Sequence, residues 1–164
     1  MKANVLVIAN RTAASPDLLA HLRELAERRA ARFELLVPPT VRGAEGRAAA
    51  QANLDAALAR CTECGLEATG SVGTDSDPVV AAVEAYDPAR HDEIVVSTLP
   101  GSASHWLGID GPHRIGRATG ALVHHVVSRE PRTVPQPVHL EPKRGPGVLA
   151  PLVALGYGRR ETGT

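Results

Sequence analysis

The chain is poor in aromatic residues and cysteine and carries no net charge. Phe, Trp and Tyr make up 2% of its 164 residues, too few for a surface that stacks nucleic-acid bases. Lys+Arg and Asp+Glu number 18 each, so we expect neither a nucleic-acid nor a membrane partner. No apolar run reaches the roughly 20 residues that span a bilayer, and the amino-terminal run is too short for a signal peptide. Cys61 and Cys64 make no disulfide framework, so we expect a cytoplasmic protein.

What is present is a regular alternation of apolar runs and helical patterns. Five apolar, mostly β-branched runs predict buried strands at 4–9, 33–37, 66–72, 93–97 and 121–128. Helical spacing or helix-start signals predict four intervening helices, near 16–26, 47–64, 78–86 and 112–119. In the third, we expect the valines and Tyr86 to form the apolar side. Alternation of this kind predicts an α/β, doubly wound, Rossmann-like five-stranded parallel sheet with helices on both faces.

The composition changes after Ser128. The stretch REPRTVPQPVHLEPKRGPG is rich in proline and charge, which is typical of an extended linker or arm. We therefore divide the chain into an α/β domain, 1–128, and a Pro-rich carboxyl-terminal arm, 129–164. An apolar patch at 148–158 is expected to dock either on its own domain or on a partner subunit.

A ligand crevice is expected where the strand order reverses, beyond the carboxyl ends of the strands. The loops after the first and fourth strands, 10–14 and 98–111, are its predicted walls. The second of these is about 14 residues long, whereas such loops usually take about 2–6, which indicates a functional loop. The alternative is a loop that packs Trp106 and Leu107 as a lid on the sheet.

The segments DEIVVS and ALVHHVV, the long loop and short helix between them, and GSVGTDSDPVVAAVEAY carry a family resemblance. In order and length they resemble the universal stress protein family, over about residues 3–128. The resemblance implies an adenine-nucleotide hydrolase-like α/β fold and a homodimer with the last strand at its interface. It also implies a candidate adenine-nucleotide ligand, ATP or AMP.

The phosphate-binding motif of that family is degenerate here. Nucleotide-binding members carry Gly, two residues, Gly, nine residues, then Gly and Ser or Thr. Without a gap, these glycines fall on Ser97, Pro100 and Asp110, and the last motif position falls on Gly111. Pro100 has no N–H for a phosphate, and Asp110 would bring a carboxylate near phosphate oxygens.

The candidate ligand-binding residues come from the two loops, the end of the second strand and the start of the last helix. Asn10 replaces an Asp that is common in the family, and it can still bond to a ribose or base. With His105, the cationic side chains on this list would line the crevice for an anion. The list is Ala9, Asn10, Arg11, Thr12, Val37, Ser97, Thr98, Gly101, Asp110, Gly111, His113 and Arg114.

Structural interpretations of Asp110 stay open beside the functional one. Asp110 can pair with Arg114, or it can serve as the N-cap of the helix that begins at Pro112.

Other chemistry-bearing residues also have structural interpretations. Cys61 and Cys64 match C-x-x-C but lie at a helix carboxyl end, where the dipole disfavours a thiolate. His124 and His125 are neighbours in a strand and must point to opposite faces, so they cannot chelate one ion. Ser102, Ser104 and His105 are close only in sequence.

We therefore expect a universal-stress-like regulatory or binding protein with no catalytic residues and no metal. A small ligand, an adenine nucleotide or another anion, would bind between the first and fourth strands. The alternative is a non-nucleotide-binding stress or interaction protein that acts through its dimer and arm. A nucleotide hydrolase is the third option.

Overall fold

The structure is a computed structural model of the chain and describes residues 2–101 and 110–131. The predicted lid residues Trp106 and Leu107, the loop residues Ser102, Ser104 and His105, and most of the predicted arm lie outside the described residues. Nine elements alternate along the chain. They are β1 (Ala3–Ile8), α1 (Pro16–Arg28), β2 (Ala31–Val37), α2 (Ala44–Glu63), β3 (Ala68–Val72), α3 (Pro78–Ala85), β4 (Glu93–Thr98), α4 (Gly111–Thr119) and β5 (Val123–Val127).

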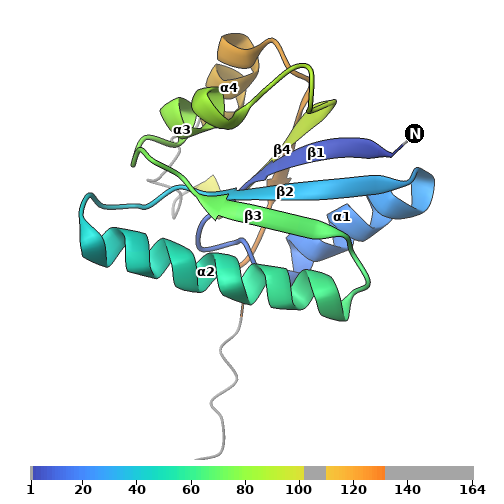
Figure 1. The fold of residues 1–164 in the computed structure, drawn as a ribbon, viewed down its shortest axis with the longest axis horizontal. Helices are drawn as coiled ribbons and strands as arrows, with labels where there is room; N and C mark the ends of the chain where they lie inside the picture. Colours follow the sequence, from blue (N-terminus) through green and yellow to red (C-terminus); the bar gives the residue numbers. More distant parts are fainter. Residues whose placement is uncertain (1, 102–109, 132–164) are drawn as a thin grey trace, which may run out of the picture. The chain divides into compact units, whose positions relative to one another are not determined.

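The strands form one sheet in the order β3-β2-β1-β4-β5, and every neighbouring pair is parallel. Helices α1 and α2 cover one face, and α3 and α4 cover the other (Figure 1). The predicted doubly wound α/β architecture is therefore confirmed. The order of strands reverses between β1 and β4, which places the predicted crevice at their carboxyl ends.

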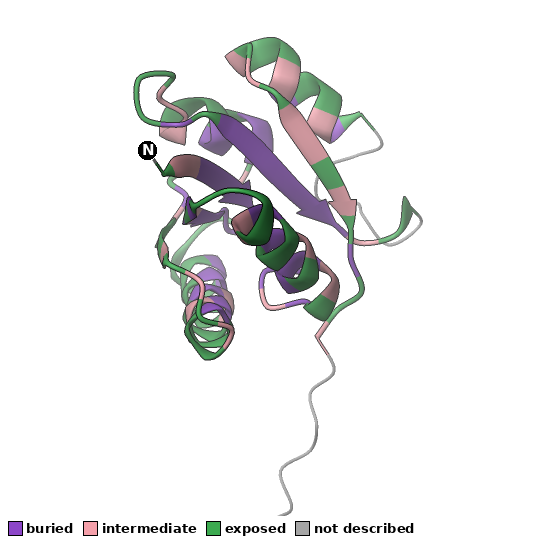
Figure 2. Ribbon diagram, turned by 90° about the vertical axis from the view of Figure 1, so that its right-hand side faces the viewer, coloured by how far each residue is buried: buried purple, intermediate pink, exposed green. Residues whose placement is uncertain are grey.

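The core consists of two apolar layers, one on each side of the sheet. Val5, Phe33 and Val95 pack against α1 and α2, whereas Leu6 and Ile94 pack against α3 and α4. Strands β1 and β4 are the most completely buried, as Figure 2 shows. This burial on both faces explains why their sequences are continuous apolar runs.

Local signals in the sequence account for the helix ends. The Ser15 hydroxyl accepts a hydrogen bond from the Asp17 N–H at 3.2 Å, and the Asp77 carboxylate caps α3 in the same way. Helix α4 ends at Gly120, whose φ of 71° suits a residue without a Cβ. Helix α2 begins at Ala44, three residues before the predicted start.

The predicted apolar side of α3 is correct only in part. Val79 is buried and Tyr86 packs against the same layer, but Val80 and Val83 are exposed. Ala81 and Ala82 occupy the buried positions instead. These small residues let the helix approach the sheet closely. The helix is rotated so that the two alanines face the sheet, and the two bulkier valines therefore point outward.

Candidate functional site

The loop after β1 lies where one wall of the crevice is predicted, and its central group is the amide of Asn10. This side chain is 5% exposed. Its Nδ2 donates to the carbonyl of Pro38 after β2, and its Oδ1 accepts from Nδ2 of Asn53 on α2 at 3.0 Å. The amide therefore ties β1, β2 and α2 together, and both of its polar atoms have protein partners.

Buried hydroxyl groups join the β1 loop to β4 and β5. Thr12 Oγ1 donates to the carbonyl of Ser97 at 3.1 Å, and the Ser97 and Ser128 hydroxyls are 2.8 Å apart. Thr98 Oγ1 lies 2.7 Å from Nε2 of His125. All three hydroxyl residues among the candidates, Thr12, Ser97 and Thr98, are buried. We call these three residues the floor of the predicted crevice. Their hydrogen-bonding groups are largely bonded to other groups of the protein.

Two candidates are apolar and lie at the carboxyl ends of β1 and β2. Ala9 is buried, and its N–H donates to the Leu36 carbonyl at 3.2 Å. Val37 is also buried, and its carbonyl accepts from the Gly73 N–H at 3.0 Å. Gly101, in contrast, is exposed. Ala9 and Val37 thus hold strand ends in register.

Two ion pairs attach the chain after β5 to the start of the domain. Arg11 pairs with Glu130, and both side chains are largely exposed. Arg129 binds Asp17 through its backbone N–H at 2.9 Å and through its guanidinium. The Arg129 hydrogen bonds hold the pKa of the Asp17 carboxyl below its ordinary value. Arg11 is therefore paired, in an exposed geometry that an anion can compete for.

The amino end of α4 supplies the exposed groups of the crevice. Gly111 is buried, whereas His113 and Arg114 are exposed. Asp110 occupies the N-cap position, as one alternative predicted, but its side chain makes no capping hydrogen bond. Its carbonyl accepts from the Arg114 N–H at 2.8 Å. The side chains of Asp110 and Arg114 are both described, and they form no ion pair. The predicted pairing of these two residues is therefore wrong.

A small hollow lies beyond the carboxyl ends of β2 and β3. Its volume is about 130 Å³, and its charged lining groups are Arg42, Arg47 and Asp75. These residues, like Pro38 and Asn53, were not among the predicted candidates. For Asn53 a signal was available, because it lies three residues after Ala50 and four before Ala57 on the buried side of α2. A polar residue at such a position indicates a specific partner.

The remaining chemistry-bearing residues have structural surroundings. Burial raises the pKa of the Cys61 thiol to about 11, and neighbouring Cys64 adds to the effect, which supports the structural interpretation of these cysteines. His124 lies beside His21 of α1 with its Nε2 3.0 Å from Glu93, whereas the next residue bonds to Thr98. The two neighbouring histidines therefore point to opposite faces, as predicted.

The described residues form neither a metal-binding cluster nor a membrane-spanning helix. Within residues 2–101 and 110–131, no three His, Cys, Asp or Glu side chains come together in an arrangement suited to a metal ion. None of the helices in those ranges is long and apolar enough to cross a bilayer.

The fold is similar to solved structures of universal stress proteins. Neither a protein-family model nor a curated protein matches the sequence. A universal stress protein from Archaeoglobus fulgidus matches with a TM-score of 0.58 and 15% identity, over 77% of this chain and 94% of that one. A universal stress protein in complex with cAMP matches at 0.54 and 22%, over 78% and 98%.

A third structure is a universal stress protein family protein from Arabidopsis thaliana with AMP bound. It matches with a TM-score of 0.54 and 15% identity, over 77% of this chain and 92% of that one. The resemblance predicted from the sequence is thus confirmed at the level of the fold: the chain has the α/β fold of the universal stress proteins.

Proposed function

We propose that this chain is a universal-stress-like regulatory protein that binds an adenine nucleotide at the carboxyl ends of β1 and β4. The observation that carries the proposal is the strand order, because β1 and β4 are neighbours at the point where the order reverses. Proteins of the same fold have been solved with AMP, dAMP and cAMP. The fold supports this location, and the residues described above are proposed to provide the chemistry.

The phosphate is proposed to bind at the exposed rim rather than at the floor. Asn10 of the β1 loop and Ser97 of the floor already bond to protein groups. At the rim, Arg11, His113 and Arg114 offer cationic or donor groups. The α4 amino end offers the backbone N–H groups of Gly111 and His113, because Pro112 has none. An anion at this rim would compete with Glu130 for Arg11.

The ligand is proposed to be a nucleotide of low charge. Asp110 is the N-cap residue of α4, and its side chain makes no capping bond that would draw it onto the helix. Two like unit charges about 4 Å apart repel by about 4 kcal/mol at an effective dielectric of 20. This repulsion increases with the number of phosphate groups near the carboxylate. We therefore expect AMP or cAMP to bind more tightly than ATP.

Calorimetry on nucleotide-free protein tests this function. AMP and cAMP are expected to give saturable heats, and ATP a weaker one. Arg114→Ala is expected to weaken AMP binding about tenfold, the usual loss for one charge-assisted hydrogen bond. Arg117→Ala, an exposed residue on the same helix, is the matched control. Absence of heat with all three nucleotides would favour the second candidate function.

That second candidate is an interaction protein that binds no nucleotide. The observation in its favour is the loss of all three motif glycines, at Ser97, Pro100 and Asp110. A role in catalysis is not part of either proposal.

A homodimer through β5 belongs to both proposals. This strand ends the sheet, so its outer backbone groups have no strand beside them within the described sheet. Leu122 and Val127 are exposed there. Sedimentation is expected to give a dimer mass for the native chain and a monomer mass for Val127→Lys. A monomer for the native chain would refute the dimer.

A further inference from the structure

A second hollow, of about 320 Å³, lies at the amino ends of the strands, far from the proposed nucleotide crevice. It is on the sheet face that α3 and α4 cover. Helix α3 has eight residues and so spans only about 12 Å at 1.5 Å per residue. On that face of β2, Leu36 is buried, Glu34 is half-buried and Arg32 is exposed. The hollow thus lies where the short helix α3 no longer covers the sheet.

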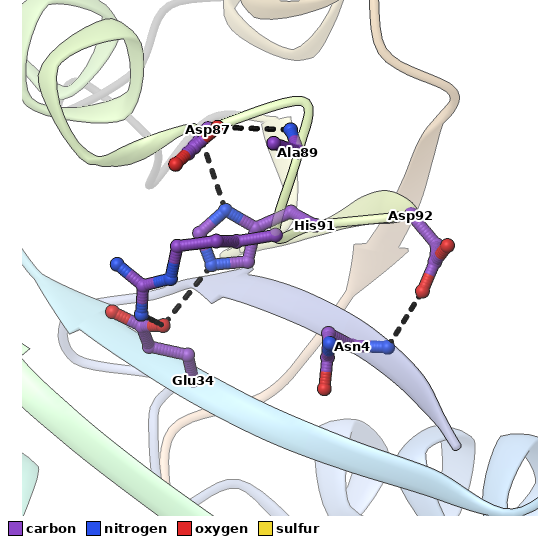
Figure 3. Close-up of polar contacts among 7 residues, drawn as sticks. Asn4, Glu34, Asp87, Ala89, His91 and Asp92 are labelled. Carbon is purple, nitrogen blue, oxygen red and sulfur yellow. Dashed lines mark hydrogen bonds and ion pairs between the residues drawn. The ribbon is translucent and has the colours of Figure 1, made fainter. Parts of the chain in front are cut away.

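One wall of the hollow is the segment between α3 and β4, and hydrogen bonds hold it in place (Figure 3). The Asp87 N–H donates to Nδ1 of His91 at 3.1 Å, and Nε2 of that ring is 3.0 Å from Oε2 of Glu34. Because Nδ1 accepts, the ring proton is on Nε2 and is donated to the carboxylate. Asp92 further accepts from the Asn4 N–H at 2.8 Å. The wall is therefore preorganised against β1 and β2.

Several polar groups of the hollow remain available to a ligand. Both His91 and Arg90 bond to Oε2 of Glu34, which leaves Oε1 as an acceptor. The side chains of Asn4 and Thr69 have no hydrogen-bond partner among the described residues. Donors and acceptors are therefore both present in the lining.

The lining contains two guanidinium groups, each paired with one carboxylate through part of its nitrogen atoms. Arg32 and Arg90 contribute two guanidinium groups, and Glu34 contributes one carboxylate. Arg32 is held by Glu67 through Nε at 2.6 Å, so its terminal nitrogens stay available. Guanidinium groups bind carboxylates with two parallel hydrogen bonds, which gives them a geometric preference for that group.

We propose that this hollow is a second ligand site, for a small carboxylate that carries a hydroxyl or amino group on the adjacent carbon. Arg32 and Arg90 bind the carboxylate. Oε1 of Glu34 accepts a hydrogen bond from the hydroxyl or amino group. A carboxylate without such a donor would bring the same negative charge beside Glu34 but would form no hydrogen bond to its Oε1.

The test is a titration of the native chain with L-lactate, followed by amide NMR. Saturable shifts are expected at Thr69, Ala89 and His91, with millimolar affinity. Arg90→Gln and Arg32→Gln are each expected to weaken binding about tenfold through the loss of a charge-assisted pair. Arg28→Gln is the matched control, because Arg28 is an exposed, paired arginine on the opposite face. Glycine is expected to shift the same amides, and propionate, which lacks the donor, to bind more weakly.

Three results would overturn the proposal. The first is the absence of saturable shifts at these amides. The second is unchanged lactate binding when both arginines are replaced. The third is propionate binding as tight as that of lactate. AMP binding is measured on the same variants and is expected to be unchanged, so that failure at one site is separated from failure at the other.

Discussion

At the carboxyl ends of the strands, polar side chains are buried and bonded to one another, whereas at the amino ends charged side chains surround an open hollow. Asn10 and Ser97 represent the first arrangement, and Arg32 and Glu34 the second. Buried neutral groups specify the position of backbone segments because every unmade hydrogen bond is costly there. Exposed charges contribute little to stability and stay available to ligands. The two ends should therefore respond differently to the same kinds of substitution.

Asn10→Ala is expected to have the largest effect. It leaves the Pro38 carbonyl and the Asn53 amide without their partner, so the free energy of unfolding should fall by about 1–3 kcal/mol, as for other buried groups left unsatisfied. Urea denaturation measures it. Asn4→Ala, the matched change at the amino end, should stay within about 0.5 kcal/mol. Equal losses of unfolding free energy in the two variants would contradict the proposed difference between the two ends of the sheet.

Ser97→Ala is expected to cost about 1 kcal/mol, because the buried Ser128 hydroxyl loses its partner. Replacing both serines by alanine removes the two hydroxyls together. The double variant should therefore lose less stability than the sum of the single losses. Strict additivity in the denaturation cycle would show that the two hydroxyls do not interact.

His21→Leu should make the protein less sensitive to mild acid. Burial lowers the pKa of His21, and neighbouring His124 lowers it further. The unfolded chain therefore binds a proton more readily, and stability is lost as the pH falls below about 6.5, the ordinary value. Thermal unfolding at pH 7 and pH 5 measures this, and an unchanged difference in melting temperature in the variant would argue against it.

Asp17→Asn should have the smallest effect on stability. Its effect on the response to acid should appear at a lower pH than that of His21→Leu. Because the folded-state pKa of Asp17 is lowered by Arg129, its stabilisation is present above the ordinary carboxyl value of 3.8 and is lost as the pH falls through the lower folded value. The variant should lose a little stability at neutral pH and show a shallower decline in acid. The same thermal scans, extended to pH 3, test this. A decline as steep as that of the native chain would refute the role of the Asp17–Arg129 pair.

Much of the fold could be predicted from the sequence because its signals are local. Capping residues such as Ser15 and Asp77, and the unbroken apolar runs of β1 and β4, act within a few positions. The partners at the candidate site are distant instead. Asn10 lies 28 residues from Pro38 and 43 from Asn53. Such pairings depend on strand register and helix rotation, which a single sequence does not reveal.

The same difference between local signals and distant packing explains why details of α3 and of the start of α4 were predicted wrongly. Val80 and Val83 follow the expected helical spacing, yet the fit of two alanines against the sheet decides the rotation of α3. Asp110 has the right chemistry for a capping residue and the right position, but its side chain makes no capping bond. Composition and spacing predict where an element lies, whereas packing decides which atoms meet.

An adenine nucleotide is proposed to bind at the carboxyl ends of β1 and β4. Amide NMR of the nucleotide-free chain during titration with AMP tests it most directly. Saturable shifts are expected at Arg11 and, at the start of α4, at Gly111, His113 and Arg114, with Thr69 and His91 unchanged. Shifts confined to the amino-end hollow, or no saturable shift anywhere, would contradict it.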